Sequence, residues 1–207
     1  MLKHVVIALA LAVGLAGTVS AAGPQDSVFS QKYNRNGKPI AEKPSVLKDF
    51  IEFRTARGFP DIEFTDREGR PVRPSDWKGS LVLLDAWATW SEHSLREIPH
   101  IIRLQERWNK PGSKVKVVAL SVDLKKKRVD KFIEKHHFEA LDTYYDLKDQ
   151  LSDKVPLDVL PAFFVLDANG HMVGFVRGFI DLSDPTVEPY IEKLAAKYAA
   201  PAGKTAK

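Results

Sequence analysis

Three segments of this chain are apolar almost without interruption, and they constrain its fold more than any other feature. Residues 80–87 read Ser-Leu-Val-Leu-Leu-Asp-Ala-Trp, and similar runs occupy residues 115–122 and 162–166. A strand with one face in water alternates apolar and polar residues, whereas a strand covered on both faces is apolar throughout. The three runs therefore predict strands at the centre of a layered α/β domain.

Other segments repeat apolar residues every three or four positions, which is typical of amphipathic helices. We expect helices at residues 91–108, 125–136 and 184–198. Pro99 should kink the first of these helices, and Asp184 followed by Pro185 is typical of the start of the last. The pair Asn169-Gly170 predicts a hairpin turn that leads into a fourth core strand at residues 171–179.

The remaining patterns are shorter. Residues 62–65 and 70–72 flank a turn sequence and predict a hairpin that precedes the core. Short helices are predicted at residues 45–58, between a Ser45 cap and Gly58, and at residues 147–155. The order of elements is typical of a central mixed β-sheet flanked by helices, with the hairpin as an N-terminal extension. We divide the chain into a signal peptide (1–22), a leader with a short helix (23–58), one domain (59–198) and a disordered tail (199–207).

The N-terminus predicts export. Lys3 and His4 precede an apolar run at residues 5–16, and small residues follow where a signal peptidase would cut, after Ala21 or Ala22. The alternative, an uncleaved anchor helix, is disfavoured because the apolar run is shorter than the ~20 residues that span a bilayer. We therefore expect a soluble periplasmic protein with no stable membrane anchor after cleavage.

Charge and cysteine content exclude several functions. The chain has a net charge of +4, and loss of the predicted signal peptide removes only Lys3, so basic and acidic residues remain nearly balanced. That balance argues against nucleic acid as a partner. We interpret the one dense basic run, residues 125–128, as the solvated face of a helix. The chain contains no cysteine, so it can form neither a disulfide nor a thiolate nucleophile.

Several ordered motifs resemble one family. They are Phe-Pro-Asp-Ile-Glu-Phe at 59–64, Ser-Asp-Trp-Lys-Gly at 75–79, Leu-Leu-Asp-Ala-Trp-Ala-Thr-Trp at 83–90, and Val-Leu-Pro-Ala-Phe-Phe-Val-Leu-Asp-Ala-Asn-Gly at 159–170. Together they resemble the thioredoxin fold, and in particular the TlpA/ResA-like branch of periplasmic thiol–disulfide oxidoreductases. In that family the third motif leads into Cys-x-x-Cys, a basic residue, an acid and a proline. This chain has Ser91-Glu92-His93-Ser94, followed by Arg96, Glu97 and Pro99.

The resemblance assigns a place to each candidate residue. Ser91 and Ser94 take the positions of the redox cysteines, and Asp85 takes that of a buried acid beneath the second cysteine. Pro161 takes that of a cis-proline facing the active-site helix, beside which an extended peptide can pair with the backbone. From the residues themselves we expect Ser91 to cap the helix. We also expect Asp85 to be hydrogen-bonded near a sheet end, for instance by Ser94 or a water molecule.

Two other chemistries are disfavoured. Ser91 as a hydrolytic nucleophile would need a base within reach, but the adjacent Glu92 and His93 should point elsewhere on the helix. His93 and His100 are seven residues apart, about 10 Å along a helix, so they cannot share one metal ion. We therefore expect no metal site and no cofactor.

Two functions remain open. The first is a non-redox module that binds a periplasmic protein or peptide client at Trp90, Glu92, His93, Leu160 and Pro161. The second is a thiol–disulfide oxidoreductase, of the kind used in redox homeostasis or cytochrome c maturation, with both active-site cysteines replaced by serine. The codons at positions 91 and 94 of the encoding gene would distinguish a natural Ser-x-x-Ser motif from an engineered one.

Overall fold

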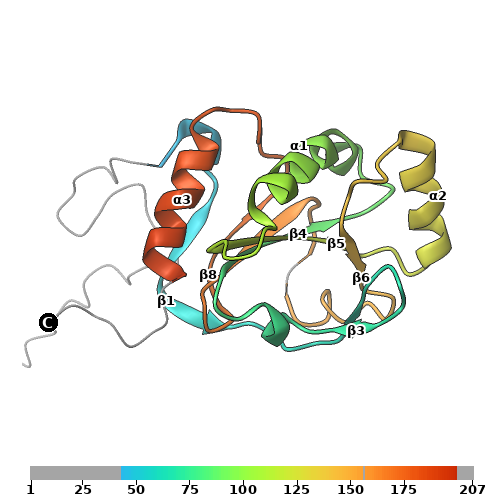
Figure 1. The fold of residues 1–207 in the computed structure, drawn as a ribbon, viewed down its shortest axis with the longest axis horizontal. Helices are drawn as coiled ribbons and strands as arrows, with labels where there is room; N and C mark the ends of the chain where they lie inside the picture. The colour runs from blue at the N-terminus through green and yellow to red at the C-terminus, as the bar shows by residue number, and fades with distance from the viewer. Residues whose placement is uncertain (1–42, 156, 200–207) are drawn as a thin grey trace, which may run out of the picture.

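The protein is built on one mixed β-sheet (Figure 1), seen in a computed structural model that describes residues 43–155 and 157–199. Within those residues the sheet has eight strands in the order β1-β8-β7-β4-β5-β6-β2-β3. The strands are β1 (Ile51–Gly58), β2 (Phe64–Thr65), β3 (Pro71–Val72), β4 (Leu81–Trp87), β5 (Val115–Ser121), β6 (Thr143–Tyr145), β7 (Ala162–Leu166) and β8 (His171–Arg177). The predicted signal peptide, most of the leader and the tail from residue 200 onward lie outside the described residues.

The sheet is centred on the three apolar runs. β4 pairs in parallel with β5 and antiparallel with β7, and every residue of β4 is buried. β7 and β8 form the predicted hairpin, and its turn glycine, Gly170, has a φ of +84°. A positive φ is readily adopted by glycine alone, which explains the Asn-Gly sequence. The predicted fold class, a mixed sheet with flanking helices, is confirmed.

Three helices lie on one side of this sheet in Figure 1: α1 (Glu92–Trp108), α2 (Lys126–His136) and α3 (Val187–Tyr198). Their apolar residues share one core cluster; examples are Ile101 of α1, Val129 of α2 and Leu194 of α3. A second cluster on the opposite face is covered by the 3₁₀ helix η2 (Pro74–Trp77), the β2–β3 hairpin and the loop before β7. Both faces of β4 and β5 are therefore buried, as their composition predicts.

The helix predicted at residues 45–58 is wrong. A single 3₁₀ turn, η1, covers Ser45–Leu47, and the chain then forms β1, which pairs antiparallel with β8. Gly174 of β8 makes this pairing possible, because a Cβ there would lie 2.6 Å from the Phe50 ring and 2.7 Å from the Ile51 carbonyl oxygen. A long-range partner therefore overrides the local helical spacing, and the sheet begins before the domain boundary expected at Phe59.

Two further predictions are corrected. Residues 147–155 form consecutive turns rather than a helix. The Asp146 carboxylate accepts the backbone N–H groups of Gln150 and Leu151, and Asp149 has a left-handed φ of +56°, so a continuous helical hydrogen-bond pattern does not form. The last helix begins at Val187, with Thr186 as its N-cap residue. Asp184 instead stabilises the preceding turn, in which it accepts the Thr186 N–H.

Candidate functional site

Ser91 is the N-cap residue of α1, as predicted. Its backbone is extended, with φ −92° and ψ 115°, and its Oγ accepts the backbone N–H of Ser94 at 3.2 Å. The same hydroxyl donates to the Leu160 carbonyl oxygen at 3.3 Å. Ser91 therefore satisfies one of the free N–H groups at the helix start and joins α1 to the loop that precedes β7.

The two serines are bound to the backbone rather than poised for chemistry. Ser94 is buried, and its Oγ accepts the Ala88 N–H at 3.4 Å. The ring of His93, the neighbouring candidate base, is engaged elsewhere, since its Nδ1 lies 2.7 Å from a guanidinium nitrogen of Arg96. In the described part of the chain no basic side chain contacts the Ser91 hydroxyl. A serine nucleophile needs such a base, so this site does not support hydrolysis.

The loop opposite Ser91 contains the predicted cis-proline. The Leu160–Pro161 peptide bond is cis, and the Pro161 carbonyl oxygen accepts the Gly178 N–H at 2.8 Å. The side chains of Leu160 and Pro161 are buried, so the binding role predicted for them can come only from their backbone. Among the described residues the Leu160 N–H has no hydrogen-bond partner. A free donor beside a strand is the group that an added strand would pair with.

Exposed apolar side chains surround this loop. Trp90 is 61% exposed, and Val159 and Phe179 are each 44% exposed. The Phe179 ring lies 5.8 Å from the His93 ring and 5.3 Å from the Arg96 guanidinium, which connects it to the first turn of α1. Sequence reasoning missed Val159 and Phe179, because Phe179 was placed inside a strand that ends two residues earlier, at Arg177. We call Trp90, Val159, Phe179 and the Leu160 backbone the docking surface.

Asp85 is buried beneath α1, and a second acid, Glu97, is buried with it. Each residue is 1% exposed, and Oδ1 of Asp85 and Oε2 of Glu97 have no hydrogen-bond partner within the described residues. Oε1 of Glu97 accepts the Ile180 N–H at 3.4 Å. The hydrogen bond expected between Ser94 and Asp85 is absent, and Ser94 Oγ accepts the Ala88 N–H at this strand end.

Burial raises the pKa of both carboxyls, since it disfavours their charged forms, and the charge of Asp85 raises the pKa of Glu97 further. The pair can therefore hold a proton near neutral pH. The burial of Glu97 was missed, although the spacing of Ser94, Glu97, Ile101 and Leu104 on one helix face could have indicated it.

A buried aspartate that the sequence did not reveal fixes the loop before α1. Oδ2 of Asp123 accepts the Thr89 backbone N–H, and Oδ1 accepts the Thr89 hydroxyl, each at 2.7 Å. Asp123 also accepts from the Ser121 hydroxyl and lies 3.6 Å from the Arg128 guanidinium. These contacts hold the backbone next to Trp90, so the exposure of that indole is imposed by the fold.

The described residues contain neither a metal-binding cluster nor a membrane-spanning helix. They contain no group of three or more histidine, aspartate or glutamate side chains arranged to hold a metal ion. None of the helices in residues 43–155 and 157–199 has the length and apolar character needed to cross a membrane.

Comparisons with known proteins identify relatives of this chain. A sequence model of the thioredoxin-like family matches residues 79–172. The chain is 30% identical over 135 residues to the thiol–disulfide oxidoreductase ResA of Geobacillus kaustophilus, an alignment that covers 65% of this chain and 75% of that protein. ResA of Geobacillus thermodenitrificans matches with the same identity and coverage.

Solved structures show the same fold. A Chlorobium tepidum structure described as the thiol:disulfide interchange protein DsbE superposes with a TM-score of 0.59 at 26% identity, over 68% of this chain and 96% of that one. The exposed lipoprotein thioredoxin Etrx1 of Streptococcus pneumoniae matches with a TM-score of 0.55 at 19% identity, over 65% of this chain and 99% of that one. With serine at both cysteine positions, the chain nonetheless belongs to the thioredoxin-like family, in the branch of the ResA thiol–disulfide oxidoreductases.

Proposed function

We propose that this protein is a non-redox binding module that holds an extended segment of a client polypeptide at the docking surface. The observation that carries the proposal is the Leu160 N–H beside the cis peptide bond, which has no partner in residues 43–155 and 157–199, with Trp90, Val159 and Phe179 exposed around it. Backbone pairing provides affinity for any extended chain, and the exposed rings provide apolar contacts.

The absence of cysteine supports a binding role rather than electron transfer. A chain without cysteine cannot form a mixed disulfide with its client, so it would hold the client only by non-covalent contacts. Such contacts are reversible, which is the behaviour expected of a carrier, a chaperone or an adaptor.

We also infer that the protein works outside the cytoplasm. The charged start, short apolar run and small residues of the N-terminal 22 residues support export. One structural neighbour, the pneumococcal thioredoxin, is described as an exposed lipoprotein. Cell fractionation tests this location: the mature chain, shortened by 21 or 22 residues, is expected in the periplasmic fraction, and a full-length cytoplasmic chain would contradict it.

Binding can be tested with an unfolded polypeptide that carries no free thiol, such as insulin B chain blocked with iodoacetamide. Calorimetric titration is expected to show saturable binding that Phe179→Ala and Trp90→Ala each weaken about tenfold, since exposed aromatics dominate such surfaces. Leu124 is 58% exposed and outside the docking surface, so Leu124→Ala is the matched control and should bind normally. Equal affinity for all three variants would exclude this surface.

A second function, thiol–disulfide exchange lost through Cys→Ser replacement, has its own support. The cis peptide bond, the Ser91–Leu160 contact and the buried acids beneath Ser94 all remain around the serines.

A further inference from the structure

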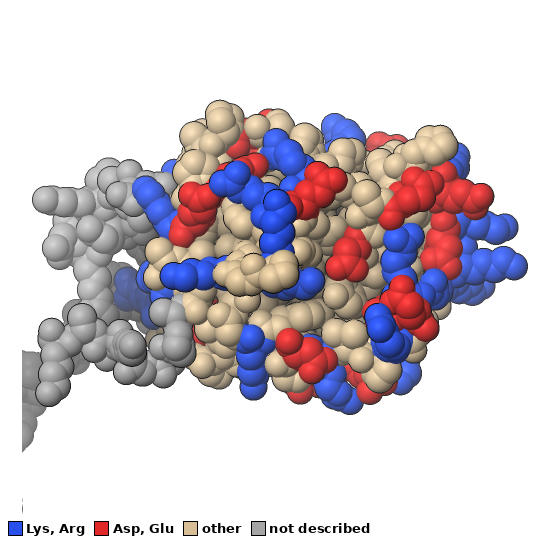
Figure 2. All heavy atoms as spheres, viewed as in Figure 1, with Lys and Arg blue, Asp and Glu red and all other residues tan. Residues whose placement is uncertain are grey.

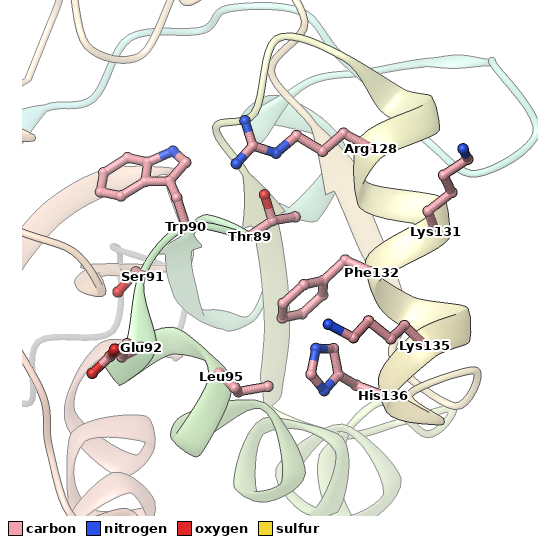
Figure 3. Close-up of a pocket in the computed structure, with 10 residues that line it drawn as sticks. All are labelled: Thr89, Trp90, Ser91, Glu92, Leu95, Arg128, Lys131, Phe132, Lys135 and His136. Atoms are coloured by element: carbon pink, nitrogen blue, oxygen red, sulfur yellow. The ribbon is translucent and has the colours of Figure 1, made fainter.

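A groove of about 440 Å³ lies between the start of α1 and the side of α2 (Figure 3). Its lining residues are Thr89, Trp90, Ser91, Glu92 and Leu95 on one side and Arg128, Lys131, Phe132, Lys135 and His136 on the other. It shares Trp90 with the docking surface but includes none of Leu160, Pro161 and Phe179. The groove therefore lies on the α2 side of Ser91 and overlaps the docking surface only at Trp90.

The α2 wall of the groove is cationic. Arg128, Lys131 and Lys135 are spaced three and four residues apart, which places them on one helix face. Arg128 has Asp123 as a neighbour at 3.6 Å, whereas Lys131 and Lys135 have no ion-pair partner among the described residues. Like charges three and four residues apart destabilise a helix slightly, so an anion bound here would relieve a repulsion that the free protein contains.

The opposite wall does not neutralise this charge. Glu92 is the only acid that lines the groove, and Figure 3 shows its carboxylate directed away from α2. The end of the groove is the N-terminus of α1, whose partial positive charge also favours anions.

The groove is apolar as well as cationic. Phe132 and Leu95 project into it in Figure 3, and the Phe132 ring lies 4.5 Å from the ring of His136. Trp90, which is mostly exposed, stands at its rim. A ligand that fits both features must carry negative charge and an apolar side chain together.

We propose that this groove binds an acidic segment of a partner polypeptide. Its carboxylates would contact the basic side chains of α2, and an apolar side chain between them would lie against Phe132 and Leu95. Arg128 and Lys135 are seven residues apart, about 10 Å along the helix. Three residues of a peptide in the polyproline II conformation cover about the same distance and complete one turn, so two acids three positions apart lie on one face and can reach both cations.

The distribution of charge favours a short acidic segment over an extended polyanion. Figure 2 shows acidic and basic side chains interspersed over the visible face of the molecule, with no continuous basic track. On α2 itself, Asp130 and Glu134 lie outside the groove lining. A nucleic acid would meet these carboxylates as soon as it extended beyond the groove.

A pair of peptides tests the proposal by calorimetric titration of the full mature protein. One ten-residue peptide carries glutamates three positions apart around a phenylalanine, and the other has glutamine in place of each glutamate. The acidic peptide is expected to bind at least tenfold more tightly at low salt and to lose most of that advantage at about 0.5 M salt, because exposed charges are screened.

Two double variants locate the binding. Lys131→Glu with Lys135→Glu should weaken the acidic peptide at least tenfold. Lys110→Glu with Lys114→Glu changes the net charge equally at the other end of α1, where both side chains are exposed, and should leave the affinity within about twofold. Thermal unfolding of both double variants confirms that each is folded.

Three results would overturn the proposal. If the two double variants lost affinity for the acidic peptide equally, the net charge of the protein alone would explain the binding. Equal binding of the glutamine peptide would mean an apolar site without charge selection. Tighter binding of a single-stranded oligonucleotide of matched charge would mean that the groove prefers a polyanion. Phe179→Ala is expected to leave the acidic peptide unaffected, so this test is independent of the proposed function.

Discussion

Asp85 of β4 and Glu97 of α1 approach each other inside the core, closely enough for the charge of one to raise the pKa of the other. Each has a carboxyl oxygen that finds no hydrogen-bond partner in the part of the chain that the structure describes. A buried carboxyl without a partner is costly when ionised, so this pair sets a pH dependence for the whole fold.

Stability is therefore expected to fall as the pH rises. The unfolded chain releases these protons near pH 4, whereas the folded protein retains them to higher pH because both pKa values are raised. In that window the folded state binds more protons, so the free energy of unfolding decreases with increasing pH. Asp85→Asn should reduce the difference in stability between pH 5 and pH 8 by about 2 kcal/mol, as measured by urea unfolding. Glu92→Gln, on the exposed side of α1, is the control and should leave the difference unchanged.

Ser91 is expected to contribute to stability as a cap. Its Oγ accepts the Ser94 N–H and donates to the Leu160 carbonyl oxygen. Because Ser91→Ala removes both bonds, it should lower the free energy of unfolding by about 1 kcal/mol. Ser91→Asp keeps a side-chain acceptor at the helix N-terminus, so its free energy of unfolding should fall by less than that of the alanine variant. Urea unfolding of the two variants measures the difference, and an alanine variant as stable as the parent would exclude a capping role.

The central part of the fold was predictable because its signals are local. The burial of β4, the Ser91 cap and the hairpin turn at Gly170 each follow from a few adjacent residues. The cis bond at Pro161 was inferred from the resemblance to a family rather than from local physics, and the structure contains it.

The predictions that were wrong or incomplete concern positions whose structure depends on residues far away in the sequence. β1 is a strand because β8, more than a hundred residues later, provides its partner. Glu97 is polar by type yet buried, and Phe179 is apolar yet exposed, and neither position follows from helix or strand periodicity alone. The groove beside Lys135 required α1 and α2 to be placed in space before its charge could be recognised.

Gly174→Ala tests the close approach of β1 and β8. The added methyl would meet the Phe50 ring, which can shift, and the Ile51 carbonyl oxygen, which belongs to the backbone and cannot move without disturbing the strand. Overpacking of this kind should lower the free energy of unfolding by about 2 kcal/mol, with a matching fall in the melting temperature. Gly58→Ala is the control in the same strand pair, because no atom lies within 4 Å of the added Cβ.

Placing cysteines at positions 91 and 94 tests how much of the redox scaffold is still functional. The parent protein should show no reduction of insulin by dithiothreitol above background, because it has no thiol to exchange. In the variant with Ser91→Cys and Ser94→Cys, the first thiol would lie at the start of α1, where the helix dipole and free N–H groups favour a thiolate. It would also face the cis bond at Leu160–Pro161, with Asp85 and Glu97 buried beneath.

We expect this variant to accelerate insulin precipitation at least tenfold over the parent. The single variant Ser94→Cys lacks the attacking thiol and should not. A double variant that forms its disulfide but remains inactive would show that the site has diverged beyond its two serines, which would strengthen the case for a module that only binds.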